Sequence, residues 1–191
     1  MSNPRIIAGK ARGYKLQSVP GTITRPITDR VKEALFNILG TDLEDATFLD
    51  LFGGTGSVGI EALSRGATSV RFLDVHRDAI NTIKTNLAHT HLESHAEVIH
   101  QDAFIFLKQP VDHQYQYIFI APPQYKGLWL KTLQILDDFP DWLSEDAWVI
   151  VQIDPVENQE HTFKHFREFD RRRYGSTLLL FYERIPTNGY I

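Results

Sequence analysis

Apolar and polar positions follow two patterns along this chain, and these patterns predict a regular succession of strands and helices. Short apolar runs predict buried strands over residues 47–51, 69–75, 97–100, 115–120 and 148–153. Apolar positions spaced three and four residues apart predict helices over residues 56–65, 78–89 and 128–136. Because strands and helices alternate, we expect a parallel, doubly wound sheet with helices on both faces.

The amino-terminal part of the chain departs from this alternation. Residues 5–27 are rich in Gly and Pro and contain short β-like fragments, which predict an arm or a hairpin. A helix should follow Thr28, a typical N-cap residue, and should end at Gly40. We therefore divide the chain into an arm over residues 1–27 and a main domain over residues 28–191.

The carboxy-terminal part also breaks the pattern, because two predicted strands follow one another without a helix. They cover residues 163–173 and 177–182 and meet at Tyr174-Gly175. Strands joined this closely pair antiparallel. The sheet should therefore be mostly parallel, with one reversed strand near its edge.

Composition excludes several classes of protein. The 191 residues fit one domain, and the absence of cysteine excludes disulfides and cysteine-ligated zinc. No apolar run approaches the roughly 20 residues that span a bilayer, and no apolar leader begins the chain. We expect a cytoplasmic protein, a monomer, with no membrane partner and no metal.

The formal net charge of −4 hides a basic segment at one end. Residues 1–33 hold two acidic side chains and seven basic ones: Arg5, Lys10, Arg12, Lys15, Arg25, Arg30 and Lys32. Such segregation suits a polyanionic partner such as nucleic acid. A solvated basic arm without a partner is the alternative that charge alone leaves open.

A glycine-rich loop, DLFGGTGSVG at residues 50–59, follows the first strand of the alternating series. Glycines let a backbone turn tightly and approach a ligand closely, and the loop fits the GxGxxG pattern of nucleotide sites. Asp74 ends the next strand, where a carboxylate can accept both ribose hydroxyls of a nucleoside. The loop and the carboxylate together predict a nucleoside site.

Asp50 indicates which nucleoside binds there. A carboxylate at this strand end would repel the pyrophosphate of NAD, but it suits the sulfonium and ammonium groups of S-adenosylmethionine. Asp102 follows the third strand, where it could accept from an adenine amino group or cap a helix. An NAD-dependent oxidoreductase is the less favoured alternative, since no Ser/Tyr-x-x-x-Lys set for hydride transfer is evident.

Five segments of the chain resemble one family, the RsmD-type 16S ribosomal RNA guanine-N2 methyltransferases. They are RIIAGKARG at residues 5–13, TRPITDRVKEALFN at 24–37, DLFGGTG at 50–56, GIEALSRGA at 59–67 and RYGST at 173–177. The resemblance implies a Rossmann-like class I methyltransferase fold, with a seven-stranded sheet and a small amino-terminal β-hairpin. It also implies methyl transfer from S-adenosylmethionine to one guanine of rRNA in the assembling small ribosomal subunit.

The resemblance assigns residues to the cofactor and to RNA. The cofactor residues are Asp50, Phe52, Gly53, Gly54, Thr55, Gly56, Asp74, Val75, Asp102 and Ala103. The residues expected to contact RNA are Arg5, Lys10, Arg12, Arg25, Arg30 and Arg172. For Arg172, within Arg171-Arg172-Arg173, a surface turn without an RNA role is the alternative.

The catalytic segment departs from the family pattern of Asp or Asn, then Pro-Pro, then Tyr or Phe. It reads Ala121, Pro122, Pro123, Gln124, Tyr125. The family's polar side chain and a proline carbonyl hold the amine hydrogens, while the aromatic ring stacks on the base. Here the Pro122 carbonyl, Gln124 and Tyr125 are the candidates for these roles. The open alternative is a protein that binds cofactor and rRNA but is catalytically impaired.

A cluster of histidines, His89, His91 and His95, could suggest a metal site. The segment contains no cysteine, and Glu93 is the only carboxylate near these side chains in sequence. We therefore interpret the segment as a solvated loop between a helix and a strand.

Overall fold

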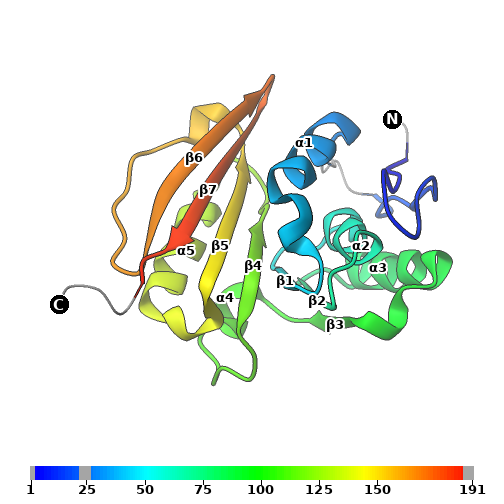
Figure 1. Ribbon diagram of the computed structural model, residues 1–191, viewed down its shortest axis with the longest axis horizontal. Coiled ribbons are helices and arrows are strands. Elements are labelled where there is room, and N and C mark those ends of the chain that lie inside the picture. Colours follow the sequence, from blue (N-terminus) through cyan, green and yellow to red (C-terminus); the bar gives the residue numbers. More distant parts are fainter. Residues whose placement is uncertain (1–2, 22–26, 187–191) are drawn as a thin grey trace.

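A seven-stranded sheet forms the centre of the computed structural model, which describes residues 3–21 and 27–186 (Figure 1). The strands are β1 (Thr47–Asp50), β2 (Ser69–Asp74), β3 (Ala96–His100), β4 (Tyr115–Ile120), β5 (Leu143–Ile153), β6 (Phe166–Tyr174) and β7 (Thr177–Arg184). Their order is β3-β2-β1-β4-β5-β7-β6. Strand β7 pairs antiparallel with both neighbours, whereas β1 to β5 pair parallel. The predicted mostly parallel sheet with one reversed strand near the edge is confirmed.

Helices cover both faces of this sheet. They are α1 (Asp29–Leu39), α2 (Ser57–Ser64), α3 (Arg77–Thr90), α4 (Ala103–Phe106) and α5 (Leu128–Asp138). Short 3-10 turns occur at η1 (Gly40–Leu43), η2 (Glu93–His95), η3 (Pro140–Trp142) and η4 (Pro155–Glu157). Side chains of α1, α2 and α3 share one hydrophobic cluster with the sheet, and those of α4 and α5 share the other.

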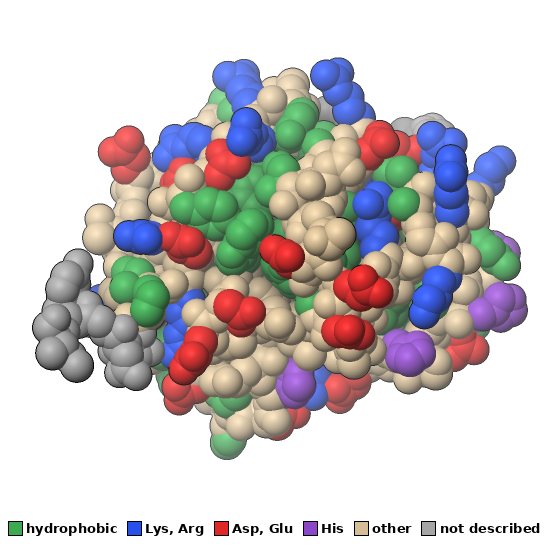
Figure 2. Space-filling model, in the orientation of Figure 1, with side chains coloured by type: hydrophobic (Ala, Val, Ile, Leu, Met, Phe, Trp, Pro, Cys, Tyr) green, Lys and Arg blue, Asp and Glu red, His purple; other side chains and the backbone are tan. Residues whose placement is uncertain are grey.

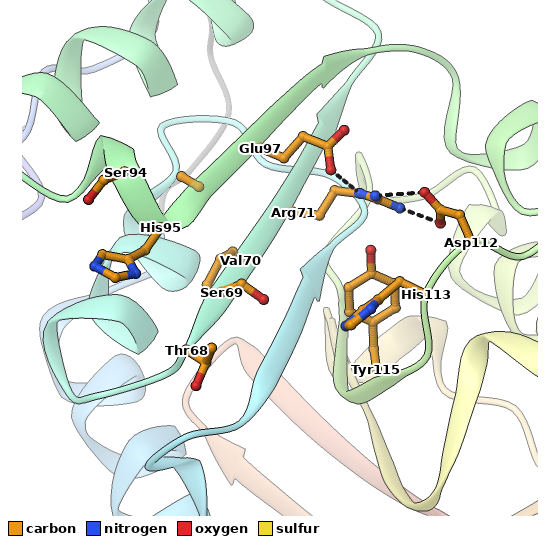
Figure 3. Close-up of a pocket in the computed structure, with 11 residues that line it drawn as sticks. Thr68, Ser69, Val70, Arg71, Ser94, His95, Glu97, Asp112, His113 and Tyr115 are labelled. Atoms are coloured by element: carbon orange, nitrogen blue, oxygen red, sulfur yellow. Dashed lines mark hydrogen bonds and ion pairs between the residues drawn. The ribbon is translucent and has the colours of Figure 1, made fainter.

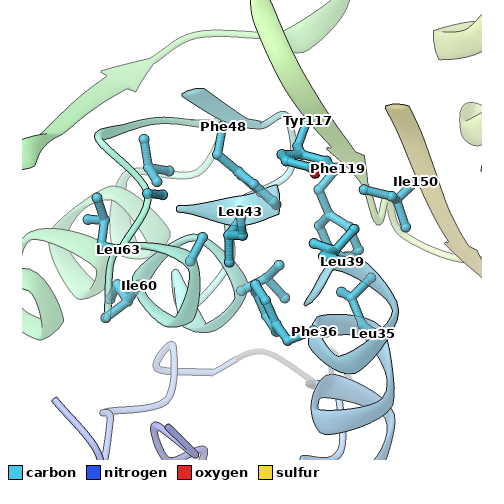
Figure 4. Packing of buried hydrophobic residues seen from close by; sticks show 14 of the residues in the cluster. Leu35, Phe36, Leu39, Leu43, Phe48, Ile60, Leu63, Tyr117, Phe119 and Ile150 are labelled. Atoms are coloured by element: carbon cyan, nitrogen blue, oxygen red, sulfur yellow. The ribbon is translucent and has the colours of Figure 1, made fainter. Parts of the chain in front are cut away.

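Strand alternation explains these two clusters. Phe48 of β1 belongs to the cluster beneath α1 and α2, and its neighbour Leu49 belongs to the cluster beneath α5. Figure 4 shows Leu39 of α1 close to Phe119 of β4 in the first cluster. Both faces of the central strands are buried, so their sequences read as nearly continuous apolar runs.

Several element bounds differ from those predicted. Strand β5 begins at residue 143 rather than 148. The prediction missed its first part because Ser144, Glu145 and Asp146 are polar. Strand β6 begins at residue 166 rather than 163. Helix α4 was not predicted, since four residues are too few to show a helical period. Helix α1 starts after the N-cap Thr28 and ends at Gly40, as predicted.

The amino-terminal arm forms a smaller hairpin than expected. A single antiparallel bridge joins Arg5 and Lys15, and no longer ladder forms among residues 3–21. Other backbone groups of the arm bond to α2. The Ile7 and Ala8 amides donate to the Glu61 carboxylate at 2.8 and 3.0 Å. The backbone of the arm thus serves both its own hairpin and the docking of the arm on α2.

Gly59 allows α2 to pack directly on β2. A Cβ atom at this position would lie 2.2 Å from Cε1 of Phe72 and 2.8 Å from Cγ1 of Val70. Gly59→Ala should therefore destabilise the protein by about 1–3 kcal/mol through overpacking. In an exposed helix the same change would stabilise by about 1 kcal/mol. Urea denaturation measures the difference, and a variant as stable as the wild type would contradict this account.

Candidate functional site

The carboxyl ends of β1, β2, β4 and β5 border a cleft of about 810 Å³. Open parallel sheets bind their ligands at this edge. The cleft is lined by every residue that the sequence assigned to the cofactor or to catalysis, apart from Gly56. Gly56 instead precedes α2 with a φ of 77°, in the left-handed region that favours glycine. The structure therefore brings the predicted residues together in one cleft, and their roles toward a cofactor and a substrate stay predictions.

The glycine loop is fixed to the end of the neighbouring strand. The Gly53 amide donates to the Leu73 carbonyl at 2.7 Å, and the Gly56 amide donates to the Gly53 carbonyl at 2.7 Å. A Cβ on Gly53 would lie 2.7 Å from Cδ1 of Ile83, so a side chain there would displace α3 or the loop. These contacts hold the loop backbone beside the cleft.

Asp74 connects the loop to the end of β2. Its Oδ2 accepts the Gly54 amide at 2.9 Å, and its Oδ1 accepts the His76 amide at 2.8 Å. An ionised carboxylate offers about four lone-pair sites. Asp74 can therefore hold the loop and still accept hydrogen bonds from a ligand in the cleft.

Asp50 is the most unusual group in the cleft. Its side chain is only 2% exposed, and within the described residues Oδ1 has no hydrogen-bond partner. Burial raises the pKa of Asp50 to about 7, and the negative charge of Asp74 acts in the same direction. Backbone hydrogen bonds from Phe52 and Gly59 lower the pKa in part, but a buried charged oxygen without a partner is still costly. A cationic ligand placed beside Oδ1 would relieve that cost.

Asp102 caps α4. Its Oδ1 accepts the Phe104 amide at 2.8 Å and the Ile105 amide at 3.1 Å. The capping role considered for this residue is therefore present. Ala103 is buried beside it, while Val75, which follows the neighbouring strand β2, is 55% exposed. Contact of these residues with an adenine stays a prediction.

The catalytic segment crosses the cleft directly after β4. Pro122 is buried, whereas Pro123, Gln124 and Tyr125 are exposed. Tyr125 has a φ of 62°, and its hydroxyl donates to Asp154 Oδ2 at 2.8 Å. That bond and the Val156 amide hold the pKa of Asp154 below its usual range. The Tyr125 ring is thus tethered at the rim of the cleft.

Sequence reasoning missed two residues of this site, Asp154 and Gln152. Gln152 lies in β5 and lines the cleft, and Asp154 follows the same strand. A signal was available, because both stand at the carboxyl end of a strand expected in the centre of the sheet. Ser57 Oγ and Gln152 Oε1 are buried without a hydrogen-bond partner in the described part of the chain, as is Asp50 Oδ1. Three unsatisfied polar atoms in one cleft fit a polar, charged ligand.

The basic residues assigned to RNA lie at the surface where they are described. Lys10, Arg12 and Arg30 are exposed, and Arg25 lies outside the described residues. Arg5 pairs with Asp29 at 2.6 Å, and Arg172 pairs with Asp170 at 2.9 Å. Figure 2 shows Lys and Arg mainly along the upper rim and most Asp and Glu in the lower half. Strands β4 and β5 of Figure 1 run toward that upper rim.

A second pocket of about 400 Å³ lies at the opposite edge of the sheet, by the amino ends of β2, β3 and β4. Figure 3 shows Arg71 held between Glu97 and Asp112, with distances of 2.6 and 2.8 Å. These partners occupy the guanidinium, and the Arg71 hydrogen bonds hold the pKa of Asp112 below its usual range. The pocket is therefore lined by an ion-pair cluster of Arg71, Glu97 and Asp112.

The histidine segment contributes to packing of the arm. The Tyr14 ring meets His89 and His91 edge-on, with centroids 5.1 and 6.4 Å apart. Among residues 3–21 and 27–186, no three His, Cys, Asp or Glu side chains are placed to hold a metal ion. No helix in the same residues is long and apolar enough to cross a membrane.

The chain is similar to a protein-family model, to known methyltransferases and to solved structures. Residues 4–183 match the family model "Conserved hypothetical protein 95". The chain is 40% identical over 150 residues to ribosomal RNA small subunit methyltransferase D of Haemophilus influenzae, covering 78% of this chain and 77% of that protein. It is 33% identical to the solved structure "Putative methyltransferase yhhF" from Escherichia coli, with a TM-score of 0.85 and coverage of 96% and 98%.

A more distant likeness concerns the fold alone. An RNA methyltransferase from Salinibacter ruber, solved in complex with S-adenosyl-L-homocysteine, is 16% identical, with a TM-score of 0.62 over 87% of this chain and 97% of that one. The sheet order and the cleft at its carboxyl edge therefore agree with a methyltransferase fold. On the match over residues 4–183 and these identities, the chain belongs to the conserved hypothetical protein 95 family, the family of the RsmD-type rRNA methyltransferases.

Proposed function

We propose that this protein transfers a methyl group from S-adenosylmethionine to the exocyclic N2 of a guanine in small-subunit (16S) rRNA. The observation that carries the proposal is the buried Asp50 carboxylate beside an intact glycine loop, because its Oδ1 has no hydrogen-bond partner in the described residues. The Haemophilus influenzae relative supports it, because its name specifies rRNA of the small subunit.

Different residues of the cleft contact different parts of the cofactor in this proposal. Asp50 faces the cationic methionine end, where an ammonium group would give Oδ1 its missing partner. The loop backbone from Gly53 to Gly56 passes beside that end, and Asp74 accepts from the ribose hydroxyls. Asp102 and Ala103 border the adenine. When bound, S-adenosylmethionine supplies an electrophilic methyl group on a sulfonium.

The catalytic segment orients the guanine amine. The lone pair of this nitrogen is delocalised into the ring, so acceptors that hold its hydrogens help to aim the lone pair at the methyl group. The Pro122 carbonyl supplies one acceptor. The Tyr125 ring, tethered by Asp154, offers a stacking surface for a base turned out of its helix. Positioning of this kind supplies much of the rate in a displacement reaction.

The basic arm and its surroundings face the RNA phosphates. Lys10, Arg12 and Arg30 are exposed and form no ion pair within residues 3–21 and 27–186, so they can neutralise phosphates without losing one. Arg5 and Arg172 would exchange surface ion pairs, which are worth little, for phosphate contacts. Arg25 belongs to the same proposed set.

The direct test is incubation with labelled S-adenosylmethionine and small ribosomal subunits that lack the modification. We expect label at N2 of one guanine. Label at another atom would contradict the N2 assignment. No label in guanine, with cofactor binding confirmed, would favour the impaired binding protein instead. Thermal-shift measurements with NAD address the oxidoreductase alternative, because stabilisation by NAD alone would overturn the proposal.

A further inference from the structure

We infer that the side-chain carbonyl of Gln152 replaces the acceptor that is missing at Ala121 and holds one hydrogen of the target amine. The inference rests on the proposed function, since it names the group that orients the base. Gln152 belongs to β5 and lies 31 positions after Ala121 in the sequence. No spacing rule links the two residues, and the sheet alone brings them together.

The register of β4 and β5 places Gln152 beside Ala121. Phe119 pairs with Ile150 and Ile120 pairs with Val151 in parallel register. The next residues along the two strands are Ala121 and Gln152, and both line the cleft. Neighbours in parallel register project their side chains from the same face of the sheet. The Gln152 side chain therefore extends over the space that the Ala121 methyl group leaves open.

The oxygen of Gln152 is buried and uncommitted. Oε1 has no hydrogen-bond partner in the described residues, although the residue lies between two paired strands. Leaving such an acceptor unsatisfied in the folded protein is energetically costly. Gln124 is the other amide near this position, but it is exposed. Water already hydrates an exposed amide, so Gln152 is the better acceptor for a desolvated amine.

Strand order places the Gln152 acceptor on the side of β4 that faces away from Asp50 and the proposed cofactor site. Asp50 of β1 pairs with Phe119 of β4, and β5 lies on the other side of β4. The methionine end of the cofactor over β1 and the amine over β4 and β5 would thus meet above the start of the catalytic segment. Pro122 and Gln152 can then accept one amine hydrogen each.

The chemical step needs no charged base on Gln152. The nitrogen lone pair forms the new C–N bond as the C–S bond breaks, and the electron pair of that bond stays on sulfur. The nitrogen becomes cationic and releases one hydrogen as a proton to water in the open cleft. The neutral amide accepts a hydrogen bond throughout and takes no proton. Gln152 is therefore a catalytic residue that positions the amine by direct contact.

The experiment compares Gln152→Met, which keeps a similar shape without the acceptor, with Gln152→Glu, which retains one. We expect the kcat of Gln152→Met for small subunits to fall on the order of 100-fold. Its Kd for S-adenosylmethionine and its thermal unfolding midpoint should stay near the wild-type values. Gln152→Glu should keep at least a tenth of wild-type kcat, and the exposed Gln109→Met is the matched control. Ala121→Asp added to Gln152→Met should restore activity.

Each other outcome overturns the inference in a recognisable way. If Gln152→Met methylates as fast as the wild type, the acceptor is not Gln152 and the proposed function stands. If Gln152→Met loses cofactor affinity to the same extent as activity, Gln152 belongs to the cofactor site. If the wild type labels no guanine at all, the proposed function fails and the inference fails with it.

Discussion

Asp50→Asn is expected to make the ligand-free protein more stable while removing most of its affinity for S-adenosylmethionine. In the folded state burial raises the pKa of Asp50 from 3.8 to about 7. Between these values the folded state binds a proton that the unfolded state does not, so Asp50 lowers stability as pH rises from 4 to 7. Three pKa units correspond to about 4 kcal/mol. Asn removes this charge, and we expect a gain of about 1–3 kcal/mol at pH 8.

The affinity should change in the opposite direction. The ionised Asp50 carboxylate is the proposed partner of a cationic group, so Asp50→Asn should raise the Kd for S-adenosylmethionine by about 100-fold or more. For the wild type, protonation of Asp50 should weaken binding about tenfold between pH 8 and pH 6. The Asn variant should show little pH dependence over this range.

Isothermal titration calorimetry at pH 6, 7 and 8 and thermal denaturation without ligand measure both effects. Asp138→Asn is the matched control, since Asp138 is exposed at the end of α5, away from the cleft lining. It should change neither quantity appreciably. An Asp50→Asn variant that binds S-adenosylmethionine like the wild type would exclude Asp50 from the cofactor site.

Glu61→Ala should cost about 3–5 kcal/mol of unfolding free energy. The Glu61 side chain is fully buried, lies 3.3 Å from Lys32 and 2.8 Å from Arg65, and accepts two amides of the arm. Burial already holds the pKa of Lys32 below its usual value, and Glu61 is the largest opposing influence. Removing Glu61 leaves a buried cation unpaired, which is a strongly destabilising change.

The arm should lose its anchor in the same variant. The Ile7 and Ala8 amides would have no carboxylate to donate to, and we expect faster proteolytic cleavage within residues 3–21. Glu33→Ala, at an exposed position of α1, should change stability by less than about 0.5 kcal/mol. Adding Lys32→Met to Glu61→Ala should recover part of the loss. A loss below 1 kcal/mol for Glu61→Ala would show that the buried pair does not hold the arm.

Local patterns were sufficient for most of the fold and for the residues of the glycine loop and the strand ends that line the cleft. The Thr28 cap, the Gly40 stop and the apolar runs of β1, β2 and β4 act within a few residues, so a single sequence displays them. The short helix α4 and the polar start of β5 were missed because neither has a periodic signal. The arm was predicted as an arm or a hairpin, but its docking on Glu61 was missed because that interaction cannot be seen locally.

The sequence by itself determined the order of elements, the reversed strand, the glycine loop and the acidic residues at the strand ends. The tertiary structure decided which distant residues meet: Glu61 beneath the arm, Asp154 on the Tyr125 hydroxyl, and Gln152 beside Ala121. Helical and strand periods record which face of an element is buried, but they carry no information about the neighbouring element. Sheet register supplies that information, because it brings residues 31 positions apart in the sequence to adjacent places at one edge.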